Sequence, residues 1–125
     1  MAITLQTNAR NAAVDGIAPL HNSGTLEIKS AASTVAGTSE VATVTFGATA
    51  FAAASGGSAS ANAITDDSSA TGGTAGFFTT FTSGAAAIMQ GVVSTSGADL
   101  NLSSVSIGAS DIVSISSFTL TQPAS

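Results

Sequence analysis

Few side chains in this sequence could carry chemistry, and His21 is the first of them. It is the only histidine among 125 residues. A general base needs a nucleophile or a substrate within hydrogen-bond reach, and no neighbour of His21 in the sequence offers one. The residue falls near the expected end of a helix, where a positive charge interacts favourably with the helix dipole. We therefore interpret His21 as a surface or capping residue.

The acidic residues could support two other kinds of chemistry. Asp66 and Asp67 could begin a calcium site, because hard cations prefer oxygen ligands. The segment "TDDSSATGG" lacks the acidic spacing and the final glutamate of such loops, so ordinary turn chemistry is favoured. The same pair with Asp99 and Asp111 could supply the two carboxylates of a glycosidase. A short chain leaves little room for the cleft, and we predict no catalytic residues, no metal site and no cofactor.

Composition and charge exclude several classes of partner. The segment "TGGTAG" lacks the lysine and the spacing of a phosphate-binding loop. Arg10 and Lys29 are the only basic residues and the net charge is −5, so the clustered cations that bind nucleic acid are absent. No run of about 18 apolar residues exists, which predicts no membrane span. The first ten residues do not resemble a signal peptide, and the absence of cysteine excludes disulfides.

The supply of large apolar side chains is small. Ala, Ser, Thr and Gly make up 75 of the 125 residues, whereas Leu, Ile, Val and Phe number only 28. Burying one large apolar side chain stabilises by about 1.5–3 kcal/mol, while ordering each residue costs about 1.5 kcal/mol. The low charge and the clustering of the apolar residues still favour folding over disorder. We expect a marginal monomer that gains stability from packing against copies of itself or a larger assembly.

One helix is predicted, over residues 8–21, because apolar residues recur there at helical spacing. Thr7 or Asn8 is a plausible N-cap. Pro19 is expected to kink the helix or to end its regular part. Gly24 follows where a C-terminal stop is expected.

The remainder of the chain has the pattern of β-structure. Residues 25–122 contain many short alternating runs separated by turn signals, which predicts an antiparallel β-sandwich or barrel-like domain. The predicted fold class is therefore mainly β, a single domain over 1–125 with one short N-terminal helix. An N-terminal arm or an edge strand is predicted over residues 1–7. Ile3 and Leu5 would share one face of this segment.

Two strands place apolar residues on both faces. Val113 and Ile115, which are two residues apart, share one face of the predicted strand. Phe118 and Leu120 share the opposite face. Either a bulge or a passage of the strand from one sheet to the other explains this change, or Phe118 and Leu120 face a neighbouring subunit.

Phe77 and Phe78 cannot both point inward from a regular strand. One of them is therefore expected at a bulge, or outside in a subunit contact. The predicted interaction residues are Ile3, Leu5, Phe77, Phe78, Phe118 and Leu120.

Most of the chain resembles small structural proteins from the virions of tailed bacteriophages. The resemblance is carried by "RNAAVD", "GTLEI", "TAGFF", "SGADLNL" and "SFTLTQP". It implies a structural component of the particle, such as a capsid cement (decoration) protein, which typically assembles as a trimer over capsomer junctions. It is equally compatible with a small tail or neck protein, and it supplies no catalytic residues.

The sequence thus leads us to expect a non-enzymatic virion structural protein that stabilises the phage head. Its expected partners are itself, as a homotrimer, and the major capsid protein, with no nucleic acid and no membrane. Its expected location is the virion, assembled in the host bacterial cytoplasm. The alternative is a small tail, neck or fibre-associated protein with a host-binding role.

Overall fold

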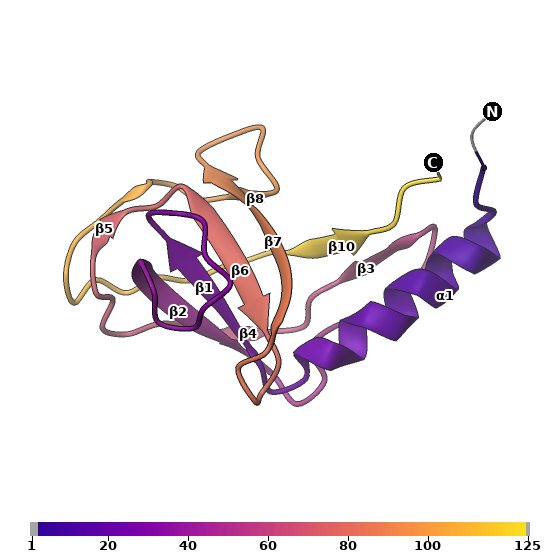
Figure 1. The fold of residues 1–125 in the computed structure, drawn as a ribbon, viewed down its shortest axis with the longest axis horizontal. Helices are drawn as coiled ribbons and strands as arrows, with labels where there is room; N and C mark the ends of the chain where they lie inside the picture. The colour runs from indigo at the N-terminus through magenta and orange to yellow at the C-terminus, as the bar shows by residue number, and fades with distance from the viewer. Residues whose placement is uncertain (1–2, 125) are drawn as a thin grey trace.

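The computed structural model describes residues 3–124, which form a mainly β fold with one short N-terminal α-helix, as predicted (Figure 1). Figure 1 shows a curled sheet on one side of the molecule and the helix on the other, next to strand β3, which pairs with β10. Met1, Ala2 and Ser125, which belong to the predicted arm and domain, lie outside the described residues. The elements are α1 (Thr7–Ile17), the 3-10 helix η1 (Ala18–His21), β1 (Thr25–Lys29), β2 (Glu40–Phe46), β3 (Ser58–Ser60), β4 (Ile64–Thr65), β5 (Gly73–Thr74), β6 (Phe77–Phe81), β7 (Ala87–Ser94), β8 (Leu100–Asn101), β9 (Ser106–Ile107) and β10 (Thr119–Thr121).

The helix begins without the predicted side-chain cap. Gln6 is the N-cap residue, with extended backbone and no side-chain capping bond. Thr7 and Asn8 lie inside the first turn, so their prediction as N-caps is wrong. Asn8 Oδ1 still accepts a hydrogen bond from the Ala9 N–H at 2.9 Å, which provides a partner for one of the free first-turn amides.

The end of the helix follows the sequence prediction closely. α1 ends at Ile17, and the chain continues as η1 with Pro19 near its start, because proline lacks the N–H that a regular helix needs. The Gly24 N–H then donates to the His21 carbonyl at 2.8 Å. A Cβ at Gly24 would overlap the Phe81 carbonyl oxygen, so glycine is required where the chain enters β1 beside β6.

The main sheet has six strands in the order β4-β2-β1-β6-β7-β8. All neighbours are antiparallel except β7 and β8, which pair in parallel through two residues. β6 and β7 form a hairpin that turns at Ser83 and Gly84. Two further two-stranded ribbons, β10-β3 and β5-β9, complete the described strands.

The core lies between one face of the main sheet and the ribbon β10-β3. Leu26 and Ile28 of β1 are fully buried there. Phe46 and Phe78 from the sheet meet Phe118, which precedes β10, with ring centroids 6.3 and 5.5 Å apart. These two layers are the sandwich-like arrangement that the sequence predicts.

The second face of β1 is also covered. Residues 30–39, here called the strap, cross over Glu27 and Lys29. Lys29 is 0% exposed, and its Nζ donates to Glu27 Oε1 at 2.8 Å and to two strap carbonyls, those of Val35 at 3.1 Å and Thr38 at 2.8 Å. The strap also donates to Glu27, through the Gly37 N–H at 2.9 Å. The central strand is therefore buried on both faces, one apolar and one ionic.

The parity change near the C-terminus corresponds to a change of pairing partner. Val113 forms an isolated bridge with Asp67, the chain bends at Ser116, and β10 then pairs with β3. The sequence pattern that we interpreted as one strong strand is thus two short paired segments joined by a bend. Val113 and Phe118 are both buried, as the predicted passage from one sheet to another requires.

Candidate functional site

The six predicted interaction residues differ widely in exposure. Ile3 is 82% exposed and Phe77 is 36% exposed. Phe77 and Phe78 point to opposite faces of β6, as predicted, and Phe77 pairs across the ladder with the exposed Val92. Phe118 is only 5% exposed and belongs to the core of a single chain. The predicted interaction residues whose side chains are partly or fully buried are Leu5, Phe78, Phe118 and Leu120.

His21 lies in the core, so its interpretation as a surface or capping residue is wrong. It is 0% exposed and its ring contacts Phe46 and Phe51 edge-on, with centroids 5.2 Å from each. The short turn of η1 after α1 folds the side chain back onto the sheet. Local sequence gives no sign of this, because the rings that surround His21 come from distant segments.

The two hydrogen bonds of His21 determine which of its ring nitrogens carries the proton. Nδ1 lies 3.3 Å from the Ala18 carbonyl oxygen, and Nε2 lies 3.0 Å from the Thr80 hydroxyl. A carbonyl oxygen can only accept, so Nδ1 carries the proton and Nε2 of the neutral ring accepts from Thr80. Burial lowers the pKa of His21 below its ordinary value of 6.5, against a smaller opposing effect of its backbone hydrogen bonds.

This environment predicts that stability depends on pH through His21. Between the lowered pKa of the folded protein and about 6.5 in the unfolded chain, the unfolded state binds more protons. The free energy of unfolding should therefore be at its full value above pH 6.5 and decline below it, by at most about 1.4 kcal/mol per pH unit. Urea titrations at a series of pH values from 5 to 8 would measure the slope.

The control for this prediction is His21→Gln, which cannot titrate in that range. Its free energy of unfolding should be lower at pH 7, because glutamine replaces the ring imperfectly, but flat between pH 6.5 and 5.5. An equal slope in both proteins would contradict the assignment, since the titrating group would then lie elsewhere.

The acidic side chains are engaged with backbone amides. Asp67 accepts from the Thr43 N–H at 2.8 Å and from the Ser69 N–H at 2.9 Å, which agrees with the turn chemistry predicted for this loop. Asp99 accepts from the Val92 N–H at 3.0 Å and Asp111 from the Gly108 N–H at 2.7 Å. Among residues 3–124, no group of three or more His, Cys, Asp or Glu side chains is arranged to hold a metal ion.

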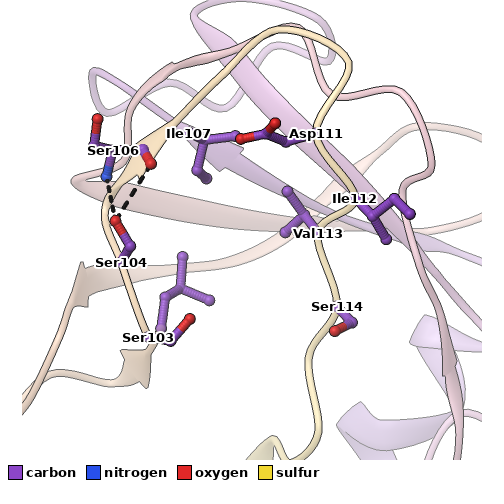
Figure 2. A pocket seen from close by; sticks show the side chains of 9 residues that line it. Ser103, Ser104, Ser106, Ile107, Asp111, Ile112, Val113 and Ser114 are labelled. Atoms are coloured by element: carbon purple, nitrogen blue, oxygen red, sulfur yellow. Dashed lines mark hydrogen bonds between the residues drawn. The ribbon is translucent and has the colours of Figure 1, made fainter.

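One hollow of about 230 Å³ lies within the segment 102–114 (Figure 2). Its lining offers several serine hydroxyls and the Asp111 carboxylate. Figure 2 shows two hydrogen bonds between the Ser104 hydroxyl and the backbone of Ser106. The hydroxyl accepts from the Ser106 N–H at 3.2 Å and donates to the Ser106 carbonyl oxygen at 3.3 Å. The lining contains no histidine, lysine or cysteine that could activate a serine.

A second hollow of about 300 Å³ runs between β7 and β10, and we call it the strand-edge groove. Phe78 and Phe118, both nearly buried, line it together with aliphatic and polar side chains. The sequence drew attention to Phe78, Phe118 and Leu120 but not to the β7 side, because only the sheet order brings β7 opposite β10. The lining residues are Phe78, Met89, Gln90, Asp99, Phe118, Thr119, Leu120 and Thr121.

No protein-family model, curated protein or solved structure matches this chain. Among residues 3–124, no helix is both long enough and apolar enough to cross a membrane.

Proposed function

We propose that this chain is a non-enzymatic structural protein of a tailed-phage particle, a capsid cement protein that binds copies of itself and the major capsid protein. The sequence resemblance to small virion proteins provides the class of particle. The observation that carries the proposal is a set of large apolar side chains left on the surface of a chain that has few of them. These are Ile3, Leu20, Val35, Phe77, Val92 and Ile112.

Exposed apolar side chains in such a chain favour contact with other proteins. Isolated apolar residues on a surface are ordinary, but here Phe77 and Val92 face each other on adjacent strands of the outer sheet surface. Burying such a pair in an interface supplies part of the stability that the small core lacks.

The titratable groups support an architectural role. His21 is enclosed by aromatic rings, Lys29 is held by Glu27 and the strap, and Asp67 is bonded to backbone amides. Each of these groups is held by contacts within the fold, and none of the three is both exposed and paired with a nucleophile. A surface of this kind suits binding rather than turnover.

The test is to locate the chain in purified particles. Antibodies raised against the purified protein should label phage heads in electron micrographs, and a particle lacking the gene should lose infectivity on heating sooner than the complete particle. Adding the purified protein back to such particles should restore heat resistance. Label confined to the tail would favour the tail, neck or fibre alternative, and absence from particles would overturn the proposal.

A further inference from the structure

The outer edge of β7 is open along part of its length. β7 pairs with β6 on one side, but on the other side it pairs with β8 only through Val93 and Ser94. The Val92 N–H points to this outer side, where Asp99 accepts its bond. Backbone groups two residues apart point the same way in a strand, so the Gln90 N–H and C=O also point outward. No described strand pairs with Gln90 there.

β10 provides a second open edge across the groove. Within residues 3–124 it pairs with β3 alone, and Thr119 and Thr121 line the groove. The strand-edge groove therefore has unpaired backbone groups on both walls and an apolar base that includes Phe78 and Phe118. Open edges of this kind are templates for an added strand.

We propose that the strand-edge groove binds the N-terminal segment Ile3–Gln6 of a second copy as an added β-strand. The inference rests on the self-assembly part of the proposed function and names the site that performs it. A strand in this position joins the main sheet to the ribbon β10-β3 through backbone hydrogen bonds on both sides.

The segment has the properties of an unpaired strand. It precedes α1 without joining it, and Gln6 is extended, with φ −75° and ψ 163°. Figure 1 shows it projecting beyond the start of α1, away from the six-stranded sheet. Ile3 and Leu5 share one face, which matches the apolar base of the groove, and Ile3 is largely exposed in the single chain. Within residues 3–124, one backbone hydrogen bond joins this segment to the C-terminal end, from the Leu5 N–H to the Ala124 carbonyl oxygen at 2.7 Å.

Charge complementarity favours this occupant. Among residues 3–124, Asp99 is the only charged residue that lines the groove, so a strand bearing carboxylates would be repelled. Ile3–Gln6 carries no charge, and the Thr4 hydroxyl and Gln6 amide can donate hydrogen bonds toward Asp99. Of the two basic residues, Lys29 is buried under the strap and Arg10 lies in α1, outside the segment, so the donors that the segment itself supplies are neutral.

Exchange of this kind closes into a ring when the rotation between neighbouring copies returns to the first copy. Each copy gives its segment to one neighbour and receives one from another, which is a head-to-tail contact between different surfaces. Three such contacts related by rotation make a closed trimer, which agrees with the oligomer expected of a cement protein.

The test uses two variants with separate defects. Ile3→Asp places a carboxylate in the segment but leaves the groove intact. Gln90→Pro removes the outward N–H of β7 but leaves the segment intact, and proline is tolerated where an edge N–H faces outward. We expect the wild-type chain to sediment as a trimer, and each variant alone to associate at least tenfold more weakly. Ile112→Asp, a charge placed outside both the segment and the groove, should associate like the wild type.

Mixing the two variants gives the sharper result. The segment of the Gln90→Pro chain fits the groove of the Ile3→Asp chain, whereas the reverse contact is doubly impaired. At a concentration where each variant alone stays monomeric, an equimolar mixture should therefore form a heterodimer, which a misfolded variant could not do. A wild-type chain that remains monomeric, variants that associate normally, or a mixture that stays monomeric would each overturn the inference. Labelling of phage heads does not depend on any of these results, so the proposed function is tested separately.

Discussion

Replacing Lys29 with methionine is expected to lower the free energy of unfolding by about 3–5 kcal/mol, the range for breaking a buried ion pair from one side. The substitution leaves the Glu27 carboxylate almost fully enclosed without its cation. It also removes the donor that binds the Val35 and Thr38 carbonyls of the strap. Urea denaturation followed by circular dichroism would measure the loss.

The matched control is the double variant Glu27→Gln with Lys29→Met. Because the buried charge is now absent from both positions, the double variant should recover the part of the loss that the unpaired carboxylate causes. The strap carbonyls still lack their donor, so recovery should be incomplete. A single variant that loses less than about 1 kcal/mol, as exposed ion pairs do, would show that Lys29 is not enclosed as described.

Replacing Phe118 with alanine should also have a large effect, about 3–5 kcal/mol, as for other buried phenylalanines. Its ring contacts three other aromatic rings, at centroid distances of 5.5 to 6.3 Å. Removing it leaves a cavity between the main sheet and the ribbon β10-β3, which neighbouring rings cannot fill without rearrangement. Thermal unfolding at low protein concentration would report the stability of the single chain.

Phe77→Ala is the control for the Phe118→Ala prediction. Phe77 lies on the outer face of β6 and keeps 36% of its surface exposed, so its loss should cost about 1 kcal/mol or less in a single chain. A small effect at Phe118 together with a large one at Phe77 would reverse the assignment of core and surface. Phe118 would then again be the residue facing a neighbouring subunit.

The small residues explain how so few large side chains enclose a core. Ala42, Ala59 and Ala75 are buried among the larger groups, and alanine permits close packing of layers at little entropic cost. Gly91 has a similar role, because a Cβ there would overlap the Phe78 ring. The apolar cluster therefore extends through the described fold, although Leu, Ile, Val and Phe are scarce.

Local pattern was sufficient for several elements. The helical spacing before Pro19, the stop at Gly24 and the hairpin after Phe81 depend on neighbours in the sequence, and the structure contains all three. The opposite faces of Phe77 and Phe78 follow from the period of a strand. The mainly β class follows in the same way, from many short alternating runs.

The groove could be predicted only in part. Phe118 and Leu120 attracted attention because their parity conflicts with that of Val113, and both line the groove or its base. Met89 and Gln90 gave no signal, since an edge strand differs from a central strand only in having no partner on one side. Sheet order, which involves segments far apart in the chain, decides that property.

Sequence by itself determined where the regular helix stops and which residues share a strand face, because these properties depend on φ, ψ preferences and side-chain period over a few residues. Tertiary structure decided what covers each face. His21 became a core residue because distant rings surround it, and Lys29 is buried because the strap closes over a face that reads as polar. Burial is a property of contacts between segments distant in the sequence, so it can reverse the environment that a local pattern predicts.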